Sequence, residues 1–97
     1  MDKAVEKYNE LARANNLRKC LKLTSARKKH LNARLAEFGF DGWMEVLHKV
    51  HGSSFLTGRT GTWDYRAKTF RFWKADFDFI VSESGFIKIM EGKYDGL

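Results

Sequence analysis

The sequence predicts a mainly α fold: a small bundle of four to five short helices with a hairpin or irregular segment near residues 57–72. Apolar residues recur at helical spacing in four separate stretches. Short connections that carry Gly, Ser or Asn separate these stretches, and the chain has no proline. The 97 residues, 43% of them hydrophobic, suffice for one buried core but not for two. Residues 1–97 are therefore predicted to form a single domain.

The first helix is predicted over residues 3–14, because the apolar side chains there form one stripe and the charged side chains lie opposite. Asn15 and Asn16 are typical of a helix end. Residues 17–23 are then expected to connect to the next helix, with their basic side chains in solvent and their leucines buried. Those leucines are Leu17, Leu21 and Leu23.

Thr24 predicts the start of a second helix, because its hydroxyl can accept a hydrogen bond from an amide of the first turn. This helix is expected to run from Ser25 to about Glu37 and to end at Gly39. Asp41 is a suitable cap for a third helix. Each helix has an apolar stripe that should face the core, formed by Leu31, Leu35 and Phe38 in the second and by Trp43, Val46, Leu47 and Val50 in the third.

The last third of the chain predicts a turn, an extended segment and two further helices. Residues 57–62, TGRTGT, are predicted to form a glycine-bearing turn. Residues 63–72 alternate well enough for a short hairpin or an extended loop. Residues 73–81 are predicted to be helical, and Ser84 is expected to cap a last helix over residues 85–90.

The charge distribution favours an anionic partner. The net charge is +6, and between Leu11 and Ala36 there are eight Lys or Arg and no Asp or Glu. A helix face that is only solvated normally mixes both signs. Nucleic acid, an acidic protein surface and an anionic membrane all remain compatible with such a chain. The candidate binding residues on the second helix are Arg27, Lys28, Lys29 and Arg34.

A second candidate patch interleaves basic and aromatic residues over Trp63 to Phe72, WDYRAKTFRF. Bases stack on aromatic rings while cations contact phosphates, so the pattern suits single-stranded nucleic acid bound through Trp63 and Tyr65. The other interpretation is a strand whose rings lie in the core and whose cations face water. The basic residues of this patch, with one from the preceding turn, are Arg59, Arg66, Lys68 and Arg71.

The sequence does not predict an enzyme, a metal site or a cofactor. It has no nucleophile elbow, no dinucleotide fingerprint and no P-loop pattern. His48 and His51 stand three residues apart without a third ligand nearby, and Cys20 is the only cysteine. No apolar run approaches the length of a membrane span, and the charged N-terminus lacks a signal-peptide core, so no membrane partner is expected.

Five motifs in order resemble a known family: YNEL, LTSARKKHLNARL, SSFLTG, WKADFDFI and KIMEGKYD. Together they span about Val5 to Asp95. The chain resembles the C-terminal module of phage and prophage replication proteins, of the replisome organiser or replication initiator type, here free-standing. That module often follows a DNA-binding winged-helix domain. The lack of a signal-peptide core and of a membrane span predicts an intracellular, soluble protein, and the resemblance implies the cytoplasm of a bacterial host cell.

The resemblance implies mainly structural roles for the matching residues. It implies that Trp73, Phe77 and Tyr94 pack in the fold. Arg27 and Lys28 match motif positions that are candidates for function, although Arg27 has the alternative of pairing with a carboxylate. The candidate carboxylates are Asp78 and Glu91. The resemblance also implies that Gly58 is a turn glycine and Gly92 a helix-cap glycine.

Two hypotheses for function follow. The first is a phage-type nucleic-acid-binding or replisome-assembly module that makes sequence-nonspecific phosphate contacts, with DNA favoured over RNA. The alternative is a small phage-encoded inhibitor or adaptor that binds a host protein complex, either a replication helicase loader or a CRISPR-type defence nuclease. The sequence predicts no oligomeric state.

Overall fold

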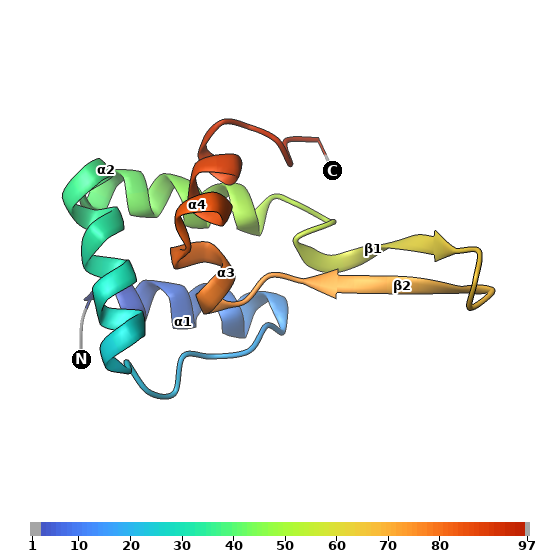
Figure 1. The fold of residues 1–97 in the computed structure, drawn as a ribbon, viewed down its shortest axis with the longest axis horizontal. Coiled ribbons are helices and arrows are strands. Elements are labelled where there is room, and N and C mark those ends of the chain that lie inside the picture. Colours follow the sequence, from blue (N-terminus) through green and yellow to red (C-terminus); the bar gives the residue numbers. More distant parts are fainter. Residues whose placement is uncertain (1–2, 97) are drawn as a thin grey trace.

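A computed structural model describes residues 3–96 and shows a mainly helical molecule from which one β-hairpin projects (Figure 1). This confirms the predicted mainly α character of a small domain. The hairpin is a two-stranded antiparallel sheet and gives the molecule its long dimension, 42 Å against 27 and 22 Å. Within the described residues the elements are, in order, α1 (Lys3–Asn15), α2 (Ser25–His51), β1 (Thr57–Asp64), β2 (Thr69–Lys74), α3 (Phe77–Val81) and α4 (Glu83–Met90).

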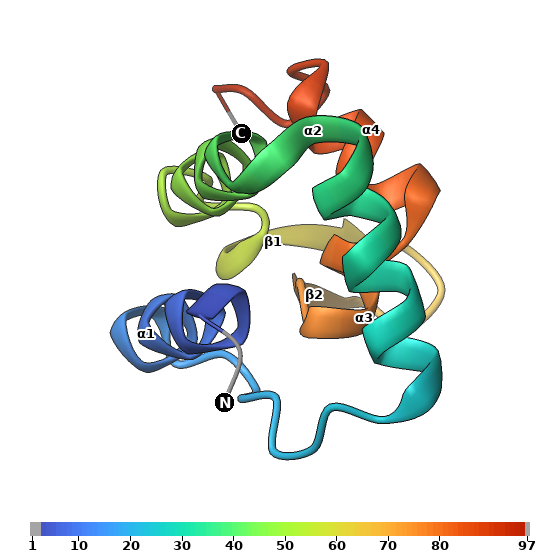
Figure 2. The same ribbon diagram turned by 90° about the vertical axis from the view of Figure 1, so that its left-hand side faces the viewer.

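Helix α2 consists of two helical segments that meet at a bend (Figure 2). Thr24 caps its start as predicted, since its Oγ1 accepts a hydrogen bond from Arg27 N at 3.2 Å. Gly39 has φ 72° and ψ 177°, which are not helical angles, so the predicted break occurs at that residue. The helix resumes directly after it, however, and Asp41 lies inside the helical turn instead of capping it.

The core forms around the indole of Trp43, which is fully buried. Its Nε1 donates a hydrogen bond to Ala4 O at 3.0 Å and so ties α2 to α1. The ring stacks on Phe86 of α4 and meets Phe77 of α3 edge-on, each at a centroid distance of 6.2 Å. Tyr8 of α1 packs against the same Phe77 ring at 5.2 Å. One side chain therefore contacts all the other helices.

Two predicted side-chain positions are wrong. Leu21, expected in the core, is 85% exposed on the connector between α1 and α2. Phe38, expected in the buried stripe of α2, is 37% exposed, although its ring still packs on Phe86. Leu17 and Leu31 are buried as predicted. In the connector the buried side chains are Leu17 and Cys20, three residues apart, and Leu23 is partly buried. Leu21 falls between these inward positions, so its apolar character does not place it in the core.

The boundaries near the C-terminal end also differ from the prediction. Residues 73–81 do not form one helix, because Trp73 and Lys74 complete β2 and only Phe77–Val81 is helical. Asp76 caps this short helix by accepting a hydrogen bond from Phe79 N at 2.9 Å. Helix α4 starts two residues earlier than expected, capped by Ser82 instead of Ser84.

The hairpin is longer than the sequence predicted. The glycine-bearing segment 57–62 forms most of β1 instead of a turn, with a bulge between Thr57 and Gly61. The connecting turn lies at residues 65–68, where Lys68 adopts a positive φ of 54°. The Phe72 ring lies across Gly61, and a Cβ built there would be 2.8 Å from the ring. Glycine at this position lets the partner strand's ring lie directly over the backbone, and a side chain there would displace the ring.

We predict that Gly85→Ala destabilises the junction of α3 and α4. A Cβ on Gly85 would lie 2.1 Å from the backbone oxygen of Phe79, so the two helices must separate to admit it. Overpacking of this kind typically costs about 1–3 kcal/mol. Urea denaturation should show the loss as a lower midpoint.

The matched control is Ser84→Ala, an exposed change one residue away in the same helical turn. It should alter the free energy of unfolding by no more than about 0.5 kcal/mol. If Gly85→Ala is as stable as the wild type, α3 and α4 do not approach each other at Gly85 as closely as described.

Candidate nucleic-acid interface

One face of the hairpin carries a row of exposed aromatic rings. Trp63 is paired with Phe70 in the sheet, and Phe72 is paired with Gly61 one step further along the same face. The Trp63 and Phe70 rings meet at 5.1 Å, and Tyr65 at the turn meets Trp63 edge-on at 6.5 Å. We call Trp63, Tyr65, Phe70 and Phe72 the aromatic face.

The rings of the aromatic face are solvent-exposed to a degree that excludes a core role. The exposed fractions are 42% for Trp63, 58% for Phe70, 60% for Phe72 and 85% for Tyr65. The interpretation that the rings of this segment lie in the core is therefore wrong for these four residues. A contiguous exposed apolar surface of this kind on a small protein indicates a site of interaction.

The opposite face of the hairpin is attached to the rest of the molecule. Trp73 stacks on Phe55 at 5.6 Å and meets Phe79 of α3 edge-on at 4.8 Å. Tyr94 also stacks on Phe55, at 5.8 Å, so Trp73 and Tyr94 both pack as the resemblance implies. Because Trp73 is next to Phe72 in the strand, it points to the other side of the sheet and anchors the foot of the hairpin.

The four basic residues assigned to the hairpin patch divide into two pairs. Arg71 forms an ion pair with Asp64 across the strands. Arg59 donates hydrogen bonds to Thr57 Oγ1 at 2.9 Å and to His51 O at 3.1 Å, which fastens the start of β1 to the end of α2. Arg66 and Lys68 lie exposed at the turn, and neither forms an ion pair within residues 3–96.

Arg27, at the start of α2, has a structural partner. Its Nε and Nη2 donate to the two carboxylate oxygens of Asp78 at 2.9 and 3.0 Å, and its Nη1 donates to Lys22 O at 3.1 Å. The alternative that Arg27 pairs with Asp78 is thus confirmed. The guanidinium joins α2, α3 and the connector, so most of its donors are occupied.

The assignment of Arg34 to the exposed basic face of the second helix is wrong. It is only 6% exposed, and its Nη2 contacts Glu37 at 2.9 Å and Glu83 of α4 at 3.8 Å. It follows the buried Leu31 by three residues, and that spacing places it on the same side of α2. Arg34 therefore cannot present its charge to a partner. Lys28 and Lys29 are exposed, and within the described part of the chain no carboxylate pairs with them.

The perturbed carboxylates belong to these structural contacts. The hydrogen bond from Arg27 holds the pKa of Asp78 below its ordinary value, against a smaller opposing effect of burial. The pKa of Asp64 is lowered first by the Ala67 amide, then by Arg71 and by the Arg66 amide. Both carboxylates therefore stay ionised to a lower pH than an unperturbed Asp, which preserves their contacts with Arg27 and Arg71.

Two further cations were missed by the sequence analysis. Arg18 in the connector and Lys74 at the end of β2 line a cleft of about 610 Å³ next to Phe72. Lys74 falls in the segment predicted to be helical, because the alternation of aromatic and polar residues along TFRF breaks at Trp73. Arg18 belongs to the connector over residues 17–23, where the sequence predicts only that basic side chains face solvent. The other lining residues are Asn16, Leu17, Ala75 and Asp76.

The described residues show neither a candidate metal site nor a membrane span. No three His, Cys, Asp or Glu side chains of residues 3–96 lie together in a way that could hold a metal ion. His51 instead shares a hydrogen bond with Asn15 at 2.9 Å. Among the helices of the same residues, none has both the length and the apolar character needed to cross a bilayer.

No known protein-family model matches the chain, and searches of curated proteins and of solved structures find no match either. The resemblance to the phage replication module therefore stays a prediction.

We predict that the Arg27–Asp78 contact stabilises the fold at neutral pH and not in strong acid. Because the pKa of Asp78 is lower in the folded than in the unfolded state, the stabilisation is present above the unfolded value, about 3.9. It is lost as the pH falls through the folded-state pKa. Asp78→Asn should thus lower the melting temperature at neutral pH, by the equivalent of roughly 0.5–1 kcal/mol for this exposed pair, and should have little effect in strong acid.

Thermal unfolding followed by circular dichroism measures the difference in melting temperature between Asp78→Asn and the wild type, at neutral pH and in strong acid. Glu45→Gln, an exposed carboxylate of α2 with no ion pair among the described residues, is the control and should change little at either pH. A difference for Asp78→Asn that is independent of pH would contradict the electrostatic assignment.

Proposed function

We propose that this protein binds single-stranded nucleic acid on the aromatic face of its hairpin. The observation that supports this most directly is the exposure of Trp63, Phe70 and Phe72 on one side of a projecting hairpin. Arg66 and Lys68 at the turn add positive charge without a structural partner among the described residues. Aromatic rings beside unpaired cations are the combination that single strands require.

A single strand fits this surface better than a duplex. In a duplex the bases already stack on one another, whereas an unpaired base can place its face on a side-chain ring. Stacking of this kind contributes about 1–3 kcal/mol per base and does not depend strongly on sequence. The hairpin offers three well-exposed rings and Tyr65 at its tip.

The lysines of α2 would supply electrostatic attraction. Lys28 and Lys29 are the exposed members of the predicted basic helix, and such contacts to phosphates position a strand without reading its sequence. The resemblance to phage replication proteins favours DNA over RNA and a role in replisome assembly, in the cytoplasm of a bacterial host. Within this proposal the protein is a binding module and not an enzyme, and it uses no cofactor.

We expect Trp63→Ala and Phe70→Ala each to weaken the binding of a fluorescein-labelled oligothymidylate of about twelve nucleotides. Loss of one stacked base corresponds to roughly a 5- to 150-fold rise in Kd. Fluorescence anisotropy at low and physiological salt measures the change. A duplex of the same length should bind less tightly than the single strand.

The matched control is Phe40→Ala, which removes an aromatic ring that is 37% exposed on α2, away from the hairpin. Its Kd should equal that of the wild type. Melting temperatures identify any variant that has lost the fold. If folded wild-type protein binds neither strand at low salt, or if the hairpin variants bind as the wild type does, the proposal is wrong.

The second candidate function is a protein-binding inhibitor or adaptor, and the same aromatic face favours it. Exposed Trp, Tyr and Phe side chains are also enriched at the centres of protein interfaces. In this alternative the hairpin would dock on a host protein complex, either a replication helicase loader or a defence nuclease.

Affinity capture from bacterial lysate, with and without nuclease, separates the two functions. If the hairpin binds nucleic acid, we expect captured proteins to be lost after nuclease treatment. If it binds a protein, a partner should survive nuclease and be lost with Trp63→Ala. The Phe40→Ala control should retain that partner.

A further inference from the structure

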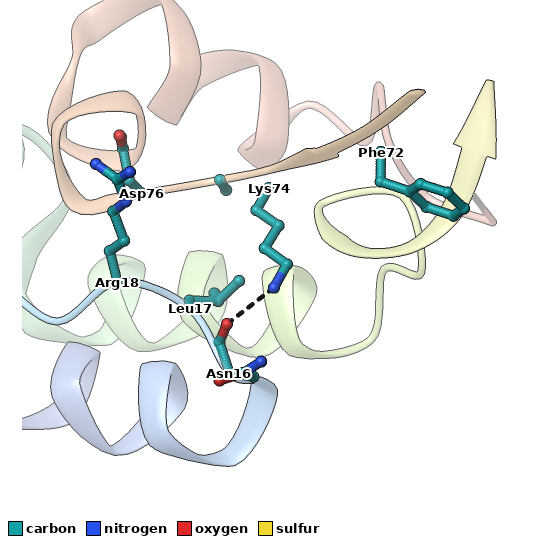
Figure 3. A pocket seen from close by; sticks show the side chains of 7 residues that line it. Asn16, Leu17, Arg18, Phe72, Lys74 and Asp76 are labelled. Carbon is teal, nitrogen blue, oxygen red and sulfur yellow. Dashed lines mark hydrogen bonds between the residues drawn. The ribbon is translucent and has the colours of Figure 1, made fainter. Parts of the chain in front are cut away.

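The cleft beside Phe72 joins the foot of the hairpin to the connector between α1 and α2 (Figure 3). It has a volume of about 610 Å³ and is formed where residues 16–18 face residues 72–76. Ligand sites for small molecules commonly measure about 300–1,000 Å³, so the cleft has room for one nucleotide unit.

Hydrogen bonds fix the positions of the two segments that line the cleft, residues 16–18 and 72–76. Tyr8 Oη donates to Arg18 O at 2.5 Å, which holds the connector against α1. Lys74 Nζ donates to Asn16 O at 3.2 Å, and Figure 3 shows this bond crossing from the strand to the connector. Because an ammonium group has three donors, Lys74 keeps donors for a ligand.

The charge of the cleft favours an anion. Arg18 and Lys74 both line it, and neither forms an ion pair with a carboxylate of residues 3–96. Asp76 is the acidic side chain among the lining residues, and its Oδ1 accepts the Phe79 amide at the start of α3. The formal charge of the lining is therefore +1, from two cations and one carboxylate.

The cleft is continuous with the aromatic face. Phe72 belongs to both, since it stands in the row of rings and also lines the cleft. Lys74 follows Phe72 by two residues, so it projects from the same face of β2. A base stacked on Phe72 would thus have its own phosphate group beside the two cations.

We propose that this cleft binds a phosphodiester group of a single strand between Arg18 and Lys74, with the adjoining base on Phe72. The inference rests on the proposed function and adds the point at which the strand is anchored. The strand then runs from the tip of the hairpin along Trp63 and Phe70 to its foot. The phosphate contact is electrostatic and independent of sequence.

The test is the salt dependence of binding of the same labelled oligothymidylate to Arg18→Ala/Lys74→Ala. Loss of one phosphate contact should reduce the slope of log K against log salt concentration by about 0.7, the value per phosphate on a single strand. The charge-conserving pair Arg18→Lys/Lys74→Arg should keep the wild-type slope. Lys88→Ala/Lys93→Ala removes the same charge from exposed positions on α4 and just after it, and should also keep the slope.

A second variant tests the cleft by a gain of affinity. Asp76→Asn removes the carboxylate charge but keeps a side chain that caps helices well, so α3 should remain intact. The formal charge of the lining rises from +1 to +2, and binding should become severalfold tighter at low salt. The melting temperature of Asp76→Asn checks that the fold is retained.

The outcomes distinguish this inference from the proposed function. If Trp63→Ala and Phe70→Ala weaken binding while Arg18→Ala/Lys74→Ala keeps the wild-type slope, the cleft does not bind the phosphate, and the proposed binding of single strands to the aromatic face still holds. If Arg18→Ala/Lys74→Ala and the Lys88→Ala/Lys93→Ala control reduce the salt slope equally, the proposed phosphate site in the cleft is also wrong. Unchanged or weaker binding by Asp76→Asn contradicts the site as well. If wild-type protein binds no oligonucleotide, both proposals fail together.

Discussion

The packing of the other helices around Trp43 is the constraint on which the rest of the structure depends. Its indole donates to α1 and lies against rings of α3 and α4, so the helical body closes around one side chain of α2. The buried hydrophobic cluster contains Leu56 and Ala75 but no residue between them. The fold thus has a complete core without the hairpin, and the exposed rings of the hairpin are surplus to folding.

The eight basic residues predicted to bind a partner separate by chemical type. Arg27, Arg34, Arg59 and Arg71 all donate to carboxylates, a hydroxyl or backbone oxygens, and each holds one element against another. Their planar, multidonor groups suit such junctions. Lys28, Lys29 and Lys68, and Arg66 alone among the arginines of this set, form no ion pair within residues 3–96. The predicted positive charge is therefore divided between residues that hold the fold together, all of them arginines, and residues without such a contact, most of them lysines.

The helices could be predicted because their signals are local. The apolar stripe of α1, the Thr24 cap and the break at Gly39 each depend on residues within a few positions of one another. The hairpin could be predicted only in part, since TGRTGT has the composition of a turn and forms a strand through pairing with a later segment. Residues 73–81 were assigned wrongly for the same reason.

The candidate site was less predictable than the fold. Alternation along a strand gives the same pattern whether the rings face a core or solvent, and only the completed core around Trp43 decides between them. The pairing of Arg27 with Asp78 was recognisable as an alternative, but the burial of Arg34 depends on where α4 packs. The cleft joins Asn16 to Lys74, which are 58 residues apart, so no local pattern indicates it.

The support of the hairpin explains how one of its faces can be left for a ligand. A two-stranded hairpin alone is marginally stable in water, so this one needs fixed points. Trp73 packs at its foot, and near its tip Asp64 accepts the Arg66 and Ala67 amides at 2.9 and 3.2 Å and pairs with Arg71. By the alternation of the strands these supports lie on the side opposite Phe70 and Phe72. A ligand covering the aromatic face therefore leaves these supporting contacts intact, and the surface is already arranged before the ligand arrives.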